Sequence, residues 1–129
     1  MSSFTDFLEN ELLDHAFASA SWTSPAAVYL ALFTVAPTDS TTGTEVPVAT
    51  GYAREAITFG TPAAAGAISN TVAVSFTAAG GNWGDIVAVA ICDASTAGNQ
   101  LAWDGITSAT VNDGDTINFA IGEIDITLT

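Results

Sequence analysis

Few side chains in this sequence could carry out nucleophilic or acid–base chemistry. There is one cysteine, Cys92, and one histidine, His15. A reactive thiolate needs a nearby imidazole or cation, and Cys92 instead lies in the apolar run 86–92. No Gly-x-Ser-x-Gly motif is present to hold a serine nucleophile. We therefore predict that Cys92 is a small buried apolar side chain, that His15 is a solvated or interface residue of a helix, and that the chain is not an enzyme.

The sequence is equally poor in patterns for metal or ligand binding. Zinc sites use clusters of Cys and His, and one of each, far apart, is too few. Residues 112–115 (Asn-Asp-Gly-Asp) are typical of a turn and lack the bidentate glutamate of a calcium loop. Fourteen acidic residues leave a paired-carboxylate glycosidase arithmetically open, although only Asp104 has a suggestive aromatic neighbour, Trp103. We predict no cofactor and no metal, and we do not expect a small-molecule ligand.

Charge is distributed very unevenly in this chain. Arg54 is the only Lys or Arg residue against 14 acidic residues, which gives a formal net charge of −13 at pH 7. Without a basic patch, the chain lacks the main driving force for binding nucleic acid and has nothing to attract an anionic membrane surface. Self-repulsion opposes the folded state, so we expect thermal stability to rise when added salt screens it.

The N-terminal segment does not have the pattern of a targeting signal. Residues 1–6 contain neither a basic region nor an apolar core, so they do not predict a signal peptide. No stretch approaches the ~18 continuous apolar residues of a membrane-spanning helix. We therefore expect the protein to be made in the cytosol without an obvious export route.

Helical periodicity is found at the N-terminal end of the chain. Ser3 is a candidate N-cap with Asp6 three residues further on, and Ser24-Pro25 would end any extension. These signals predict a helix over about residues 3–18. Its apolar stripe consists of Phe4, Phe7, Leu8 and Leu12, with Phe17 near its end.

The rest of the chain has the alternation and turn spacing of short β-strands. Runs 26–35 and 83–92 are apolar on both alternating faces, so each should be covered on both sides, within the fold or by a neighbouring chain. Six further strands are predicted at 52–59, 68–76, 100–106, 107–111, 116–121 and 123–128, with a Pro/Ala linker at 60–66. About eight strands and one helix indicate a single domain, 1–129, with a mainly β fold: an antiparallel, jelly-roll-like β-sandwich.

Period-two alternation also predicts which side chains face the core. The residues expected to point inward are Val72, Val74, Phe76, Ile117, Phe119, Ile121, Ile124, Ile126 and Leu128. On strand 52–59, Tyr52 and Arg54 share one face, and Ile57 and Phe59 share the other. We therefore predict that Arg54 points away from the core.

Several short motifs follow one another in a recognisable order. They are residues 7–17 (FLENELLDHAF), 28–34 (VYLALFT), 51–54 (GYAR), 82–84 (NWG), 91–94 (ICDA), 101–103 (LAW) and 111–117 (VNDGDTI). In order and spacing they resemble a family of small tailed-phage virion proteins, commonly labelled tail-fibre-like and similar to capsid decoration or cement proteins. The resemblance covers nearly the whole chain and implies a virion structural protein with a jelly-roll-like β fold. The chain departs from that pattern at 106–111, where no basic residue occurs.

The resemblance leaves two functions open. The leading hypothesis is a capsid decoration protein, made in the host cytoplasm, that binds the outer capsid surface and stabilises the shell. Its partners would be the major capsid protein and other copies of itself, as a trimer. The alternative is a binding module on the tail or its fibre that contacts a host receptor.

Candidate assembly contacts come from the helix stripe and from strand 52–59. They are Phe4, Phe7, Leu8, Leu12, Tyr52 and Arg54. We expect Arg54 to pair with a carboxylate of a neighbouring subunit. Two interpretations of the helix remain open: it packs between subunits, or it covers a sheet of its own domain.

Overall fold

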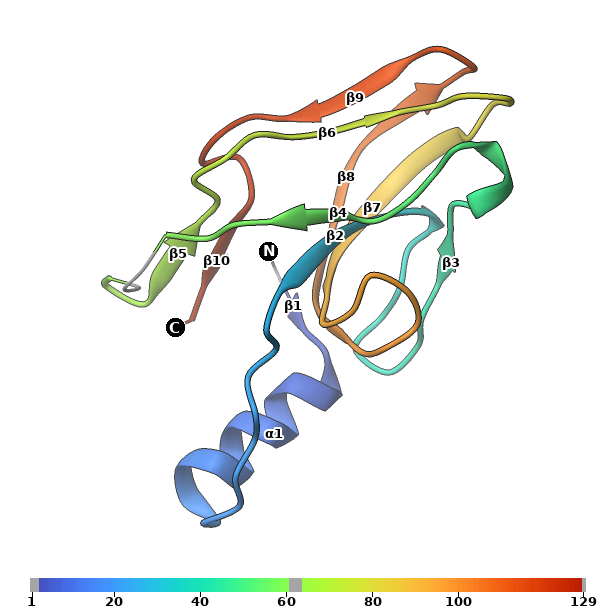
Figure 1. The fold of residues 1–129 in the computed structure, drawn as a ribbon. Coiled ribbons are helices and arrows are strands. Elements are labelled where there is room, and N and C mark those ends of the chain that lie inside the picture. The colour runs from blue at the N-terminus through green and yellow to red at the C-terminus, as the bar shows by residue number, and fades with distance from the viewer. Residues whose placement is uncertain (1–2, 61–63, 129) are drawn as a thin grey trace.

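The computed structural model describes residues 3–60 and 64–128, and it confirms a mainly β, antiparallel fold with one α-helix near the N-terminus (Figure 1). The predicted linker 60–66 lies partly outside the described residues, at 61–63. Helix α1 spans Asp6–Phe17, and a short 3₁₀ helix, η1, spans Val48–Thr50. The strands are β1 (Ser3–Phe4), β2 (Val28–Val35), β3 (Thr44–Glu45), β4 (Glu55–Ile57), β5 (Ala67–Ser69), β6 (Val74–Thr77), β7 (Gly84–Cys92), β8 (Gln100–Val111), β9 (Thr116–Phe119) and β10 (Asp125–Thr127).

The largest sheet brings together strands that are far apart in the sequence. Its order is β1-β8-β7-β2-β3, and β4 pairs with β2 on the same side as β3. Two further pairs, β6 with β9 and β5 with β10, form separate two-stranded sheets. Every one of these pairings is antiparallel.

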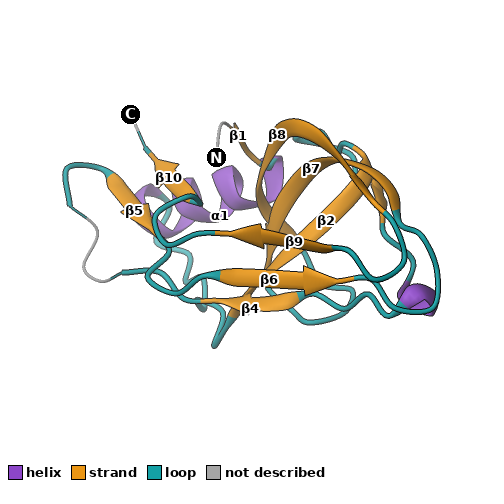
Figure 2. Cartoon of the chain, turned by 90° about the horizontal axis from the view of Figure 1, so that it is seen from above, coloured by secondary structure: helices purple, strands orange, loops and turns teal. Residues whose placement is uncertain are grey.

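The main core lies between two layers of strands. Figure 2 shows β6 and β9 running across one face of the sheet formed by β2, β7 and β8, beside β4, which pairs with β2. An aromatic group fills the centre: the Tyr52 ring stacks on Phe76 at 6.1 Å and meets Trp83 edge-on at 5.6 Å. This arrangement is an antiparallel sandwich. The buried side chains between the layers include Leu30, Leu32, Ile57, Val74, Phe76, Ile86, Val89, Ile91, Leu101 and Phe119.

The opposite face of the main sheet is also covered, and by the chain itself. Small side chains line it, with Phe33 at the centre, and they form a second buried cluster that includes Cys92. Pro37 is fully buried, and Trp103 packs against the cluster while its Nε1 donates to Asp39 Oδ1 at 2.9 Å. The two strands that read as apolar on both faces are therefore covered within the fold rather than by a neighbouring chain.

Asn70 fastens the second layer of strands to the C-terminal pair. Its side chain is buried, and its Nδ2 donates to the carbonyl oxygens of Val72 (2.9 Å) and Ala120 (3.1 Å). Its Oδ1 accepts from the Ile124 amide at 3.0 Å. A single amide thus satisfies three backbone groups where two bends of the chain meet.

The helix begins later than the sequence predicted. Thr5, not Ser3, is the N-cap, and its Oγ1 accepts from the Leu8 amide at 3.4 Å. Ser3 and Phe4 instead pair with Trp103 and Ala102 as edge strand β1. Because β8 takes these residues into its sheet, the chain can turn into the helix only after Thr5.

Strand boundaries and three predicted inward side chains also need correction. The predicted strands 100–106 and 107–111 form one strand, β8, while 68–76 is divided in two by the bend after Asn70. Val72, Ile121 and Leu128 are 56, 68 and 62% exposed, so their predicted inward orientation was wrong. Val72 and Ile121 lie in bends or turns and Leu128 lies beyond the end of β10, where strand alternation no longer holds.

Candidate assembly surface

Arg54 was predicted to face a neighbouring subunit, but its side chain is only 9% exposed and is bound within its own chain. Its Nε and Nη2 donate to the two carboxylate oxygens of Glu45, each at 2.8 Å. Its Nη1 donates to the carbonyl oxygens of Ala94 (2.9 Å) and Ala97 (2.7 Å). Arg54 therefore joins β3 to the loop between β7 and β8.

Tyr52 was also predicted to point outward, and it lies instead in the aromatic core. Its hydroxyl donates to Glu45 Oε1 at 2.6 Å and accepts from the Leu32 amide at 3.0 Å. Alternation failed here because Tyr52 and Arg54 precede β4, which begins only at Glu55. Tyr52 and Arg54 are thus parts of the domain's own structure.

The ionisation of these groups follows from their contacts. Burial opposes the charged form of Glu45, but the hydrogen bonds from Arg54 and Tyr52 outweigh it and hold its pKa below the usual value. Burial and the bond to Glu45 raise the pKa of Tyr52, and the bond to Glu45 raises that of Arg54. The group therefore remains an ion pair with a neutral tyrosine throughout the physiological range.

Helix α1 is anchored at one end and exposed at the other. Leu8 is buried in the core, and Phe4, Phe7 and Leu12 pack against the core while remaining partly exposed. The last turns differ: Phe17 is 82% exposed. Figure 1 shows the helix and the segment that follows it extending away from the strands. We call residues 13–27, the exposed end of the helix and its return to β2, the helical arm.

The helical arm is held in place by its own contacts. Ser19 adopts a left-handed conformation (φ 59°), which ends the helix, and the amides of Ala18 and Ala20 both donate to the Asp14 carbonyl. The Trp22 amide donates to Nδ1 of His15 at 3.2 Å, and the Trp22 side chain packs against the main core. The returning segment is thereby fixed alongside the helix.

An apolar groove of about 450 Å³ lies between the helix, strand β1 and Leu128, the residue that follows β10. Leu13 lies on one wall of the groove and is 56% exposed, and nothing in the described structure covers it. We call this hollow the arm groove. Its lining residues are Phe4, Glu9, Leu12, Leu13, Ala16, Phe17 and Leu128.

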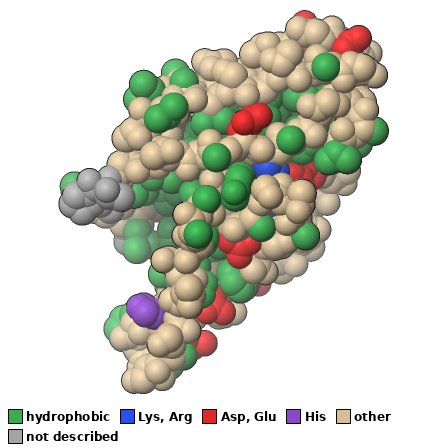
Figure 3. Space-filling model, viewed as in Figure 1, with side chains coloured by type: hydrophobic (Ala, Val, Ile, Leu, Met, Phe, Trp, Pro, Cys, Tyr) green, Lys and Arg blue, Asp and Glu red, His purple; other side chains and the backbone are tan. Residues whose placement is uncertain are grey.

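The surface around the arm groove is acidic. Two carboxylates of helix α1 lie beside it: Glu9 lines the groove, and Asp14 is one turn before Phe17. Figure 3 shows acidic side chains beside apolar ones where the helix lies, and Lys/Arg atoms only as a small patch among other side chains higher on that face. Exposed apolar patches with polar residues around them occur at contact sites for proteins, membranes or ligands.

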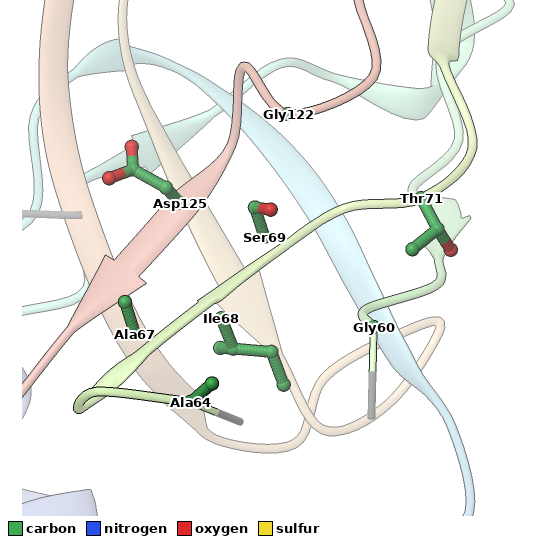
Figure 4. A pocket seen from close by; sticks show the side chains of 8 residues that line it. All are labelled: Gly60, Ala64, Ala67, Ile68, Ser69, Thr71, Gly122 and Asp125. Atoms are coloured by element: carbon green, nitrogen blue, oxygen red, sulfur yellow. The ribbon is translucent and has the colours of Figure 1, made fainter. Parts of the chain in front are cut away.

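A second hollow, of about 460 Å³, lies near β5 and β10 and is drawn in Figure 4. Ser69, Thr71 and Asp125 are its polar side chains, and its lining contains no aromatic ring. Ligand pockets usually combine aromatic or apolar walls with a few converging polar groups. In the residues that the structure describes, no group of three or more His, Cys, Asp or Glu side chains is placed to hold a metal ion.

The assembly contacts predicted from the helix stripe do not all lie on one surface. Phe4 and Leu12 line the arm groove, whereas Leu8 is core and Phe7 faces a different, polar cleft formed with residues 38–42. Leu13, Phe17 and Leu128 were missed as contacts. A usable signal existed for Leu13, because it lies four residues before Phe17, the last residue of the predicted stripe, and so neighbours it on the helix surface.

In the described part of the chain, no helix combines the length and apolar character that crossing a membrane requires.

Comparison with known proteins gives the chain a family. No curated protein matches it. The family model of the podophage GP4 fiber I protein gp80 matches residues 3–127, which include both the strands and the helical arm. Because this match covers almost the entire sequence, the chain belongs to that family of phage virion proteins.

Proposed function

We propose that this protein is a non-enzymatic structural component of the virion, a capsid decoration protein that attaches to the outer capsid surface through the arm groove. The observation that carries the proposal is the exposure of Leu13 and Phe17 at the end of a helix whose other large apolar side chains, Phe7, Leu8 and Leu12, are packed. Burying a large apolar side chain stabilises a contact by about 1.5–3 kcal/mol. Repeated over many copies, such contacts would stabilise a shell.

The charge of the chain supports an external position. A protein with a net charge of −13 on the inner wall of a capsid would face packaged DNA and be repelled by it. On the outer surface the same charge keeps the particle soluble. The major capsid protein is then the expected partner, and a trimer of this chain is the expected oligomer.

A second candidate function is favoured by the name of the matching family, which contains the word "fiber". In that case the chain would be part of the tail or of its fibre and would contact a receptor on the host surface. The arm groove would then join the chain to the rest of the fibre.

The number of copies in each particle distinguishes these two functions. Quantitative mass spectrometry of purified virions should find hundreds of copies for a capsid decoration protein and only a handful for a tail component. Particles that lack the chain should also release DNA at a lower temperature or after a milder osmotic shock. Unchanged release, together with a low copy number, would rule out the decoration function.

A further inference from the structure

We infer that the arm groove binds a segment of a different protein, one with large apolar side chains flanked by Lys or Arg, and that it does not bind a second copy of this chain. This inference rests on the proposed function, since it takes the arm groove to be the attachment surface. It adds the chemistry of the partner. Three features of the structure support it: the apolar walls of the groove, its acidic rim, and the lack of an available cation on this chain.

The apolar walls require an apolar occupant. The groove volume of about 450 Å³ falls within the range of roughly 300–1,000 Å³ found for pockets that enclose a ligand. One wall is the helix, with Leu13 and Phe17, and the other includes Phe4 and Leu128. Glu9 is the one charged residue in the lining, so polar contacts are confined to that side.

The acidic rim requires positive charge on the partner. Glu9 lines the groove one turn before Leu13, and Asp14 lies one turn before Phe17, whereas Glu11 lies on the other side of the helix. A partner with acidic residues there would place like charges together while water is excluded, which opposes binding. Lys or Arg next to the apolar anchor would instead form ion pairs with this rim.

A second copy of the chain is poorly suited to supply that charge. Arg54 is the only Lys or Arg in the sequence, and four of its hydrogen bonds are made within its own domain. It would have to leave Glu45 to reach a neighbour. Nδ1 of His15 accepts the Trp22 amide, so only Nε2 of that imidazole is left to contact a neighbour. Two copies would also each bring a formal charge of −13 to the contact.

Salt should therefore act in opposite directions on folding and on attachment. Screening reduces repulsion within the isolated chain and should raise its melting temperature. Screening also weakens attraction between an acidic rim and a basic partner, so the same salt should release the chain from virions.

Cross-linking in assembled virions tests the identity of the partner. A photoreactive phenylalanine analogue is introduced at Phe17, with Val72 as the control position because it is exposed and lies outside the groove. After irradiation of purified virions, mass spectrometry identifies the joined peptides. We expect position 17, and not position 72, to join to another virion protein at a segment that contains Lys or Arg beside apolar residues.

Other results of this experiment would overturn the inference. Cross-links from position 17 to a second copy of this chain would show self-association through the groove. Cross-links to an acidic or uncharged segment would refute the charge argument, and absence of cross-links in virions that contain the chain would show that the groove is not a contact. If the virions do not contain the chain at all, the proposed function itself fails.

Charge reversal provides an independent measurement. Glu9→Lys should reduce the amount of chain per virion by about fivefold to tenfold, since it places a cation where the partner's cation must lie. Glu55→Lys changes the net charge equally at an exposed position outside the groove and should have no comparable effect. Equal incorporation of the two variants would contradict a basic partner.

Discussion

Replacing Arg54 tests whether this residue holds the domain together rather than joining subunits. The variant Arg54→Met keeps much of the apolar stem and removes the guanidinium. It loses two bonds to the Glu45 carboxylate, both at 2.8 Å, and two to backbone carbonyl oxygens. Hydrogen bonds to charged groups contribute about 1.5–3 kcal/mol each. Because Glu45 is 26% exposed and Tyr52 still donates to it, water replaces part of the loss.

These terms predict a loss of about 2–4 kcal/mol in the free energy of unfolding. With an unfolding entropy of about 2.1 cal/mol/K per residue, the melting temperature should fall by about 7–15 °C. Differential scanning calorimetry or circular dichroism of the purified chain measures this change. Glu45→Gln should be destabilising too, and the double variant should lose less than the sum of the single losses because the two residues share their bonds.

Glu55→Gln is the matched control, since it removes one negative charge from an exposed residue of β4. It should change the melting temperature by no more than a few degrees. If Arg54→Met melts within about 2 °C of the unmodified chain, Arg54 does not stabilise the domain, and the proposal that it pairs with a neighbouring subunit would need to be reopened.

Four other results are expected. The pKa of Glu45 lies below its usual value near 4.5. The ionised Glu45 side chain therefore stabilises the fold above pH 4.5, and this stabilisation is lost as the pH falls through the lowered pKa. In acid titrations, the difference in stability between the unmodified chain and Glu45→Gln should shrink accordingly. Asn70→Ala should cost about 3 kcal/mol in urea unfolding because three backbone groups lose their partner, whereas a loss below 1 kcal/mol would mean that water replaces the amide. Burial raises the pKa of the Cys92 thiol to about 11, so a thiol reagent at pH 8 should react with it only after unfolding, and rapid reaction of the native chain would contradict its place in the core. The melting temperature should rise between low and physiological ionic strength, and a fall would refute the role assigned to self-repulsion.

The parts of the fold that local patterns determine were predictable. The mainly β class, the single helix and the burial of Cys92 follow from periodicity and from turn residues, and the structure confirms them. The turn at Asn112–Asp115 was likewise recognisable, and Gly114 adopts the positive φ (87°) that such a turn can require. These features depend on residues that are neighbours in sequence.

The features that failed depend on contacts between distant segments. Arg54 donates hydrogen bonds to Glu45 and to the carbonyl groups of Ala94 and Ala97, and none of these partners is evident from the residues around Arg54. Alternation assigned Tyr52 and Arg54 to the surface because it assumed a strand that does not extend to them. An ion pair of this kind can be inferred only once the topology is known.

The arm groove was only partly predictable, because its walls come from distant parts of the chain. The helix stripe identified Phe4 and Leu12, but the opposite wall includes Leu128, more than 100 residues further along the chain. Sequence periodicity also could not separate Leu8, which is buried, from Phe17, which is exposed. That difference arises because only the first part of the helix lies against the strands.

Incorporation of a groove variant into virions tests the central claim most directly. The double variant Leu13→Ser, Phe17→Ser changes two exposed side chains, so its melting temperature should remain close to that of the unmodified chain. Its copy number in purified virions, measured by mass spectrometry, should fall at least tenfold, while the control Val72→Ser should be incorporated normally. Normal incorporation of the folded double variant would contradict attachment through the arm groove.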